Sequence, residues 1–310
     1  MKRLFLFMAV TLVALCSSIA TTKAQAPERQ NWDGGFSLYG NVESVTITGY
    51  ELQDKFGEVI RGDVLGKCKY FFNNAGDVIE YAKYNSDGSL DEKSIYKYNS
   101  SGNMIEMSWY NSAGSLYWKY KYDSSGNMVE CAGYNSDGSL YVKDIYKYDS
   151  SGNRIERAGY NSAGLLYEKY IYKYDSSGNM IEEASCDSDG WLEGKNIYKY
   201  DSSGNMVEHA DCASDGSLIR KSIYKYDSSG NKIERADYDS DGSLGGKDIY
   251  KYDSSGNMIE EAGYYSDGSL DRKFIYKYDS SRNLIEETIY NSDALMPVYQ
   301  TGVKIVYRNE

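Results

Sequence analysis

The sequence predicts an all-β protein, in which a long antiparallel β-meander forms a coiled or spiralling open sheet or a β-solenoid-like array. The first observation behind this prediction is a repeat of 26 residues, about eight copies of which fill residues 72–290. The second is the composition of the 310-residue chain, with 34 Tyr, 30 Gly and 2 Pro. Abundant tyrosine favours pleated strands, and regularly spaced glycine favours tight turns. A fixed period of this length is typical of one small unit stacked on its neighbours.

Two turn sequences in each repeat set the strand boundaries. One is Asp-Ser-Ser-Gly-Asn, as at 149–153, and the other is Asn-Ser-Asp-Gly-Ser, as at 135–139. In both, glycine occupies the place where a three-residue hairpin loop needs a positive φ. The turns recur every 12 or 14 residues, which predicts strands of about 9 and 11 residues in alternation.

The pairing of residues across these turns predicts two different faces. Counting outward from the turn at 149–153 places Lys147 opposite Ile155 and Tyr146 opposite Glu156. Side chains alternate along a strand, so one face is expected to be covered and the other to be charged and wet. By this count the covered face contains Tyr146, Tyr148, Leu140, Tyr134, Ala132 and Met128.

One position varies strongly among otherwise similar repeats. It follows each Ile-Glu or Val-Glu pair. Its occupants are Met107, Cys131, Arg157, Glu183, His209, Arg235, Glu261 and Glu287. The same count assigns this position to the wet, charged face, because an exposed site tolerates such a range.

Unequal strands shift the register steadily in one direction, which favours a sheet that coils with its tyrosine face inside. An extended single layer with exposed aromatic rows is the alternative. The ends depart from the repeat and are interpreted as caps over the strand edges. The predicted segments are a signal peptide (1–24), a linker (25–40), a degenerate N-terminal capping hairpin (41–71), the repeats (72–290) and a C-terminal capping strand (291–310).

The first residues predict export from the cell. Lys2 and Arg3 precede an apolar stretch, and Thr22-Lys23-Ala24 offers a cleavage site after Ala24. Lipidation at Cys16 is left open as an alternative. We therefore expect a secreted protein of the periplasm or the bacterial cell surface, with no membrane span after signal cleavage.

Charge and cysteine content restrict the partners. The net charge of −12 argues against nucleic acid, which needs a basic surface. Cys186 and Cys212 are one repeat apart, too far for a disulfide between alternate strands. The composition names no partner, and a surface glycan or a protein are the candidates.

The Tyr-Asp-x-x-Gly-Asn core, as at Tyr148–Asn153, resembles the YD repeat of the Rhs family over residues 72–290. Proteins of that family form spiralling β-sheets that can enclose a cargo, so the resemblance implies coiling. The family commonly follows the turn Gly with Arg and a leucine, and this chain departs from that pattern, with Gly152-Asn153-Arg154-Ile155 and Gly178-Asn179-Met180-Ile181 in that place. The sequence contains no Rhs core segment and no distinct C-terminal toxin.

Catalytic chemistry finds little support in the sequence. The only histidine is His209, which argues against a histidine-based triad, and we expect no enzyme activity and no cofactor. One loop has the carboxylate spacing of a calcium site, formed by Asp237, Asp239, Asp241 and Asp248. The other repeats lack this spacing, so a plain hairpin turn is the favoured interpretation and no metal is expected.

Three functions remain open from the sequence. The first is a non-enzymatic interaction or adhesion scaffold at the cell surface or in the periplasm. The second is a carbohydrate-binding array that uses rows of tyrosine. The third is a remnant or accessory of an Rhs-type toxin system. The candidate glycan or partner-binding residues are Tyr134, Tyr146, Tyr148, Tyr160, Tyr172 and Tyr174.

Overall fold

The structure is a computed structural model that describes residues 38, 41–55, 58–292 and 297–307. The predicted signal peptide lies outside these residues. Among the described residues, no helix is long and apolar enough to cross a membrane. The strands are β1 (Val42–Lys55), β2 (Glu58–Phe72), β3 (Val78–Asn85), β4 (Leu90–Tyr98), β5 (Met104–Asn111), β6 (Leu116–Tyr122), β7 (Met128–Tyr134), β8 (Leu140–Tyr148), β9 (Arg154–Asn161), β10 (Leu166–Tyr174), β11 (Met180–Asp187), β12 (Leu192–Tyr200), β13 (Met206–Ala213), β14 (Leu218–Tyr226), β15 (Lys232–Asp239), β16 (Leu244–Tyr252), β17 (Met258–Tyr265), β18 (Leu270–Tyr278), β19 (Leu284–Tyr290) and β20 (Pro297–Tyr307).

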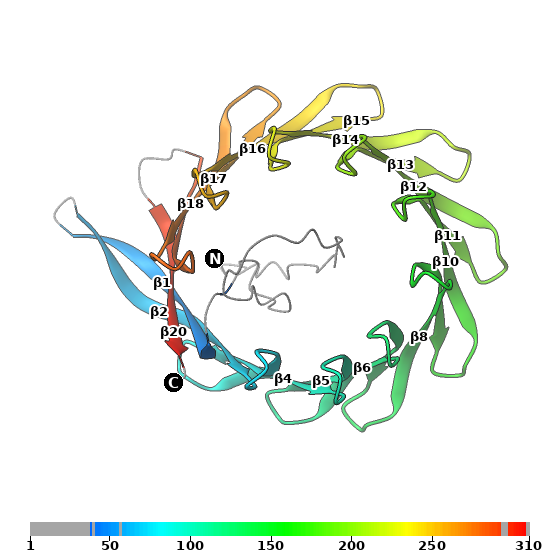
Figure 1. Cartoon of the computed structure of the whole chain (residues 1–310), viewed down its shortest axis with the longest axis horizontal. Coiled ribbons are helices and arrows are strands. Elements are labelled where there is room, and N and C mark those ends of the chain that lie inside the picture. Colours follow the sequence, from blue (N-terminus) through cyan, green and yellow to red (C-terminus); the bar gives the residue numbers. More distant parts are fainter. Residues whose placement is uncertain (1–37, 39–40, 56–57, 293–296, 308–310) are drawn as a thin grey trace, which may run out of the picture.

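These strands form one closed antiparallel β-barrel. In the described part of the chain the sheet has 20 strands, each paired with its neighbours in chain order. The ring closes because β1 also pairs with β20, from Val42 opposite Tyr307 to Glu51 opposite Tyr299. Figure 1 shows the resulting ring viewed along the barrel axis.

The predicted open coil or solenoid is therefore wrong, although the all-β meander is confirmed. The prediction treated the two ends of the sheet as caps on free edges. In the structure these ends satisfy each other's backbone hydrogen bonds, and a closed barrel has no unpaired edge.

The hairpin turns have the predicted geometry. At the turn between β8 and β9, the Asp149 N–H donates to the Asn153 carbonyl at 2.9 Å. Gly152 has a φ of 84°, and the corresponding Arg282 adopts the same left-handed region with a φ of 69°. The Asp149 side chain accepts the backbone N–H groups of Ser151 and Asn153, both at 2.9 Å. Hydrogen bonds from Asn153 hold the pKa of Asp149 below its ordinary value.

A β-bulge beside each turn makes the predicted pairing wrong by one residue. Tyr148 is opposite Arg154 as expected, but Lys147 is opposite Glu156 and Tyr146 is opposite Arg157. An extra residue on one strand is a common device where a sheet twists strongly. Its consequence is that the variable position shares a face with the constant tyrosines.

A second bulge lies beside the other type of turn. There Tyr134 is opposite Leu140, while Gly133 is opposite Val142, which leaves Tyr141 as the extra residue. Ala132, Tyr134 and Leu140 consequently lie on the face opposite that of Tyr146. The predicted covered face thus combined residues from both sides of the sheet.

Burial of large apolar side chains is concentrated where the barrel closes. Val42, Val45, Tyr70, Phe72 and Val78 form a buried cluster on β1, β2 and β3. In the repeats, the fully covered apolar positions are mostly alanine, such as Ala132 and Ala262. The wall of the barrel is therefore a single sheet that exposes two faces of different chemistry.

Candidate functional site: the inner wall of the barrel

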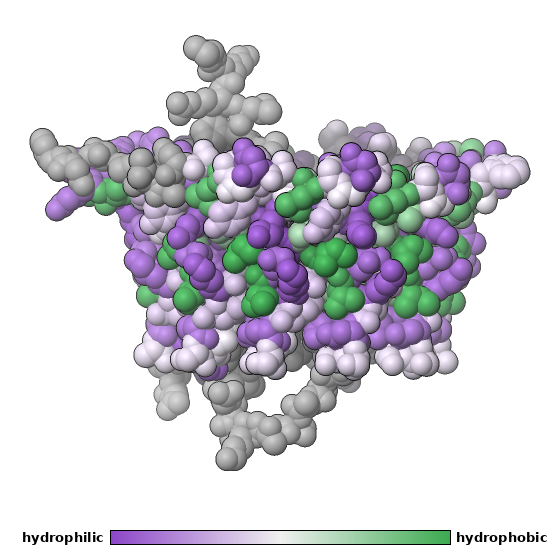
Figure 2. All heavy atoms as spheres, turned by 90° about the horizontal axis from the view of Figure 1, so that it is seen from above, coloured by the Kyte–Doolittle hydropathy of each residue, from purple (hydrophilic) through white to green (hydrophobic). Residues whose placement is uncertain are grey.

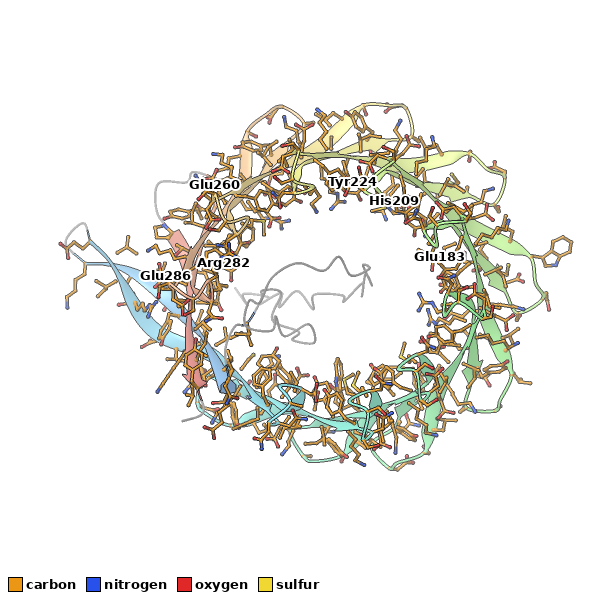
Figure 3. The ribbon with its side chains drawn as sticks, viewed as in Figure 1. Glu183, His209, Tyr224, Glu260, Arg282 and Glu286 are labelled. Atoms are coloured by element: carbon orange, nitrogen blue, oxygen red, sulfur yellow. The ribbon has the colours of Figure 1, made fainter. Side chains whose placement is uncertain are left out.

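The outer wall carries the side chains that alternate with the constant tyrosines, such as Lys147 and Glu156. Figure 3 shows Glu260 and Glu286 outside the ring, whereas Glu183, His209 and Tyr224 lie inside it. Figure 2 shows one side of the outer wall, where hydrophobic patches lie between hydrophilic residues. The two faces of the sheet can therefore be compared residue by residue.

Ion pairs between neighbouring strands run around the outer wall. Glu156 on β9 binds Lys147 on β8 and Lys169 on β10, each at 2.8 Å. Glu106 makes the same pair of contacts with Lys97 and Lys119. We call this feature the Lys–Glu belt; its lysines and glutamates are Glu80, Lys93, Lys97, Glu106, Lys119, Lys121, Glu130, Lys147, Glu156, Lys169, Lys173, Glu182, Lys195, Lys199, Glu208, Lys225, Glu234, Lys247, Lys251, Glu260, Lys273, Lys277 and Glu286.

The inner wall has a constant half made of tyrosine. Tyr146 and Tyr172 are 9% and 5% exposed, and burial raises the pKa of both phenols. A second row follows two residues later, where the Tyr148 hydroxyl donates to the Met128 carbonyl at 2.7 Å. The equivalent bond recurs in later repeats, as from Tyr252 to the Lys232 carbonyl at 2.8 Å. These tyrosines connect adjacent hairpins and are structural.

The other half of the inner wall is variable. It consists of the four positions represented in one repeat by Val142, Asp144, Arg157 and Gly159. Asp144 is opposite Gly159 on β9, and Val142 and Asp144 are opposite the equivalent positions, Gly133 and Cys131, on β7. Around the barrel these positions carry Tyr81, Lys83, Glu92, Ser94, Met107, Trp109, Trp118, Cys131, Gly133, Val142, Asp144, Arg157, Gly159, Glu168, Tyr170, Glu183, Ser185, Gly194, Asn196, His209, Asp211, Arg220, Ser222, Arg235, Asp237, Gly246, Asp248, Glu261, Gly263, Arg272, Phe274, Glu287 and Ile289. We call this set the variable band.

Arginine organises one part of the variable band. Arg157 binds Asp144 at 3.1 Å and Glu168 at 2.9 Å, and so links three neighbouring strands. Burial raises the pKa of Asp144, an effect that the charge of Arg157 opposes. Arg154, next to the band, places its guanidinium 4.5 Å from the ring centre of Tyr172.

The single histidine lies in the next part of the band rather than on the wet outer face. The His209 ring stacks on Tyr198 at 4.8 Å, with an angle of 6° between the planes. Its Nε2 lies 3.0 Å from Asp211, which also binds Arg220. The assignment of this position to the charged outer face is therefore corrected, because the bulge reverses it.

Carboxylates dominate a third part. Burial raises the pKa of Asp248, Glu261 and Glu287. The Tyr276 hydroxyl donates to Glu261 at 3.4 Å, and the Thr301 hydroxyl donates to Glu287 at 3.3 Å. Glu261 and Glu287 thus each have a separate hydrogen-bond donor.

The residues predicted from the sequence as a binding site do not form one surface. Tyr146, Tyr148, Tyr172 and Tyr174 lie on the inner wall, and the hydroxyls of Tyr148 and Tyr174 are bonded to backbone carbonyls. Tyr134 and Tyr160 lie on the outer wall, opposite Leu140 and Leu166. The variable band was missed as a site because the bulge was missed, although its variation was visible in the sequence.

The four aspartates with the spacing of a calcium loop are also separated in the structure. Asp237 accepts a hydrogen bond from Ser222 at 2.5 Å, and Asp241 accepts two from Ser243. Asp248 lies on the next strand, opposite Arg235. Among the described residues, no three His, Cys, Asp or Glu side chains are grouped in a way that could hold a metal ion, so Asp237, Asp239, Asp241 and Asp248 form no such group.

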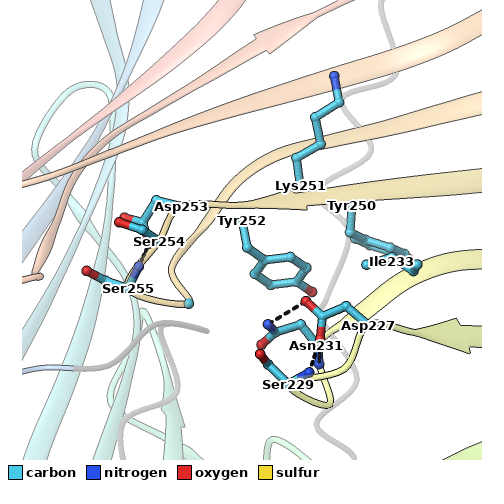
Figure 4. Close-up of a pocket in the computed structure, with 11 residues that line it drawn as sticks. Asp227, Ser229, Asn231, Ile233, Tyr250, Lys251, Tyr252, Asp253, Ser254 and Ser255 are labelled. Atoms are coloured by element: carbon cyan, nitrogen blue, oxygen red, sulfur yellow. Dashed lines mark hydrogen bonds between the residues drawn. The ribbon is translucent and has the colours of Figure 1, made fainter.

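A groove of about 720 Å³ lies at one rim, between successive Asp-Ser-Ser-Gly-Asn turns. Figure 4 shows Tyr252 between the turn that contains Asp227 and the turn that contains Asp253. The Asp227 carboxylate accepts hydrogen bonds from Ser229 and Asn231. These groups are occupied by the turn itself, and the groove follows from the stacking of two identical turns.

No protein-family model matches the chain, and no curated protein matches its sequence. A porin-like protein from Bacteroides uniformis is similar over 86% of this chain and 98% of its own, at 10% identity and a TM-score of 0.38. A TcdB2-TccC3 complex is similar over 74% of this chain but 17% of its own, at 12% identity and a TM-score of 0.26. A DUF1329 family protein from Desulfovibrio piger covers 86% of this chain and 84% of its own, at 7% identity and a TM-score of 0.21. Since these TM-scores are below 0.5, the similarities carry no argument about function, and the likeness to YD repeats stays an interpretation of the sequence.

Proposed function

We propose that this chain is a secreted, non-enzymatic binding protein of the bacterial cell surface or periplasm, and that the variable band is its recognition surface. The observation that carries this proposal is the distribution of differences among the repeats. Lys147 and Glu156 of the outer wall keep their identity around the barrel, as does Tyr146. The four positions of the variable band differ in charge, size and polarity.

Physical chemistry supports this division of roles. Constant tyrosines and constant ion pairs join each hairpin to the next, so the fold does not require the band to vary. Arg157, Glu183 and His209 instead give neighbouring hairpins different charges. A surface of differing polar and aromatic groups on a rigid sheet is suited to recognising a particular partner.

The outer wall supports an aqueous location. Lys147 has 62% of its side chain exposed while it binds Glu156. Water solvates charged side chains that are exposed to this degree, whereas charged side chains facing hydrocarbon destabilise a barrel wall. The interaction surface is therefore the inner wall, with the outer wall in contact with solvent.

The test is a binding screen of the purified whole chain against a glycan array, bacterial cells and a peptide library. The inner variant replaces Arg157, Glu183, His209 and Arg235 with Ser. The matched outer variant replaces Lys147, Lys173, Lys199 and Lys225 with Ser. We expect ligands of the wild type to be lost by the inner variant and retained by the outer variant, with circular dichroism showing both to be folded. Equal retention by both folded variants would exclude the variable band as the recognition surface.

A further inference from the structure

An aromatic patch on the inner wall contains both tryptophans of the variable band and two tyrosines next to them. It is formed by Trp109 on β5 and by Trp118 and Tyr120 on β6, with Tyr117 beside them. Trp109 and Trp118 are directly opposite each other in the register. The ring centres of Trp109 and Tyr120 are 6.0 Å apart, and those of Trp118 and Tyr120 are 6.3 Å apart.

The local backbone is adapted to these large rings. A Cβ atom on Gly133 of β7 would come within 3.1 Å of two ring carbons of Trp118, so this glycine leaves room for the indole. Strand β6 has 7 residues, whereas the equivalent strands β8 and β10 have 9. On β8, Asp144 separates Val142 from Tyr146 on the inner face. Strand β6 lacks the equivalent of Asp144, so Trp118 is the next inward-facing residue to Tyr120.

Polar groups lie at the edge of the rings. The Trp109 indole N–H is buried and has no hydrogen-bond partner in the structure. A buried donor without a partner is costly and indicates a place for a ligand or water oxygen. On the other side, the Tyr117 hydroxyl donates to the Glu92 carboxylate at 3.2 Å, and the Tyr117 ring centre lies 5.8 Å from that of Trp109.

The combination identifies the chemistry of the ligand. Aromatic faces pack against the C–H faces of pyranose rings, while an indole N–H and a carboxylate bond the hydroxyls around the ring edge. Lys83 lies opposite Glu92 in the register and binds Asp91 at 2.8 Å. These three groups together carry a negative charge, which disfavours acidic sugars, while the Glu92 carboxylate accepts hydrogen bonds from neutral ones. An unfunctionalised apolar chain would leave both polar groups unused.

We propose that the aromatic patch of Trp109, Trp118, Tyr120 and Tyr117, with Glu92, is a subsite for a neutral, hydroxyl-rich glycan. This inference rests on the proposed function, because it assigns a ligand class to one part of the variable band. Trp118 and Tyr120 supply the stacking surface, and Trp109 adds both a ring and the donor. Glu92 and Tyr117 fix the orientation of the sugar.

Isothermal titration of the whole chain with hexasaccharides tests the proposal. The neutral probes are cellohexaose, maltohexaose, laminarihexaose and chitohexaose, and the acidic probe is a hyaluronan hexasaccharide. We expect at least one neutral probe to bind and the acidic probe not to bind. The double variant W109A/W118A is expected to weaken binding by about tenfold or more, since a stacked aromatic contact contributes on the order of 1 kcal/mol and 1.4 kcal/mol corresponds to a factor of ten.

Two controls separate binding from stability. Trp191 is 75% exposed in a turn, and W191A is expected to leave the affinity unchanged. W109F keeps a ring but removes the N–H, and is expected to lose only part of the affinity. If W109A/W118A proves unfolded by circular dichroism, W109F and the conservative W118F take its place, and their full retention of affinity would contradict the proposal.

The outcomes also distinguish this inference from the proposed function. If no neutral hexasaccharide binds, or if binding is indifferent to W109A/W118A, the glycan subsite is wrong. In that case the proposed function still stands when another ligand from the screen depends on Arg157, Glu183 and His209. It fails together with the glycan subsite when no ligand depends on any inner-wall residue.

Discussion

The inner and outer walls of this barrel are made by the same strands, yet they follow different rules. Glu260 and Glu261 are adjacent in the chain and have opposite surroundings. Burial alone would raise the pKa of Glu260, but hydrogen bonds from Lys251 and Lys273 outweigh it and lower the pKa. Burial raises the pKa of Glu261, and the charge of Asp248 raises it further. The difference teaches that lysines offset the cost of a partly buried carboxylate on the outer wall, whereas the inner wall leaves that cost in place.

The largest expected difference between the two walls is the loss of stability when a constant tyrosine is removed. Tyr172→Ala removes a ring that is 5% exposed and packs against Arg154, so we expect the free energy of unfolding to fall by about 3–4 kcal/mol. Ile181→Ala on the outer wall removes a side chain that is 37% exposed, and we expect a loss of about 1 kcal/mol. Urea denaturation of both variants measures the difference. Equal losses would show that the two walls contribute alike.

A smaller effect is expected from ion pairs on the two walls. Arg157→Ala leaves Asp144 on the inner wall without its partner, and the side chain of Asp144 is 10% exposed. We expect a loss of about 2 kcal/mol, below the range for fully buried pairs because Arg157 is partly exposed. Lys147→Ala on the outer wall is expected to cost less than about 1 kcal/mol. High salt should reduce the effect of Lys147→Ala more than that of Arg157→Ala, and the reverse order in denaturation curves would contradict the comparison.

The smallest effect concerns the two adjacent glutamates and has opposite signs. The folded pKa of Glu261 is above its ordinary value of 4.5, so its charge destabilises the fold as the pH rises through that value; Glu261→Gln is expected to raise stability at pH 7. The folded pKa of Glu260 is below 4.5, so its contribution is present above that value and is lost as the pH falls through the folded pKa. Glu260→Gln is therefore expected to lower stability at pH 7.

Melting temperatures of the two variants at pH 7 and near pH 3 check this prediction. The difference between each variant and the wild type should shrink at the lower pH, where both glutamates are increasingly protonated. A destabilising effect of Glu261→Gln at pH 7 would show that its hydrogen bond from Tyr276 outweighs its burial.

Local rules in the sequence predicted local structure well. The turns at 135–139 and 149–153 carry their own conformational signal, because glycine favours positive φ, and the strands follow from their spacing. The assignment of side chains to the two faces of the sheet was harder to predict. The bulges at Ile155 and Tyr141 have no residue signature, and each reverses the alternation of side chains along its strand. One missed residue therefore moved Arg157 and His209 to the wrong wall, and with them the candidate site.

Closure could not be predicted from the repeat, because it depends on residues more than 240 positions apart in the chain, such as Val45 and Ile305. Each of these strands has an ordinary apolar pattern that fits a cap as well as a partner strand. The aromatic patch was partly visible, since Trp109 and Trp118 are departures from the repeat. Their proximity required the register, which places them opposite each other.

The pairing of β1 with β20 has a consequence for how such a gene can change. Each duplication of a repeat would insert one complete hairpin, which preserves the directions of the first and last strands. The first and last strands would still pair antiparallel, and the barrel would have a larger diameter. We therefore expect recombination between repeats to produce a series of rings of graded calibre, each lined by its own sequence of inward-facing residues.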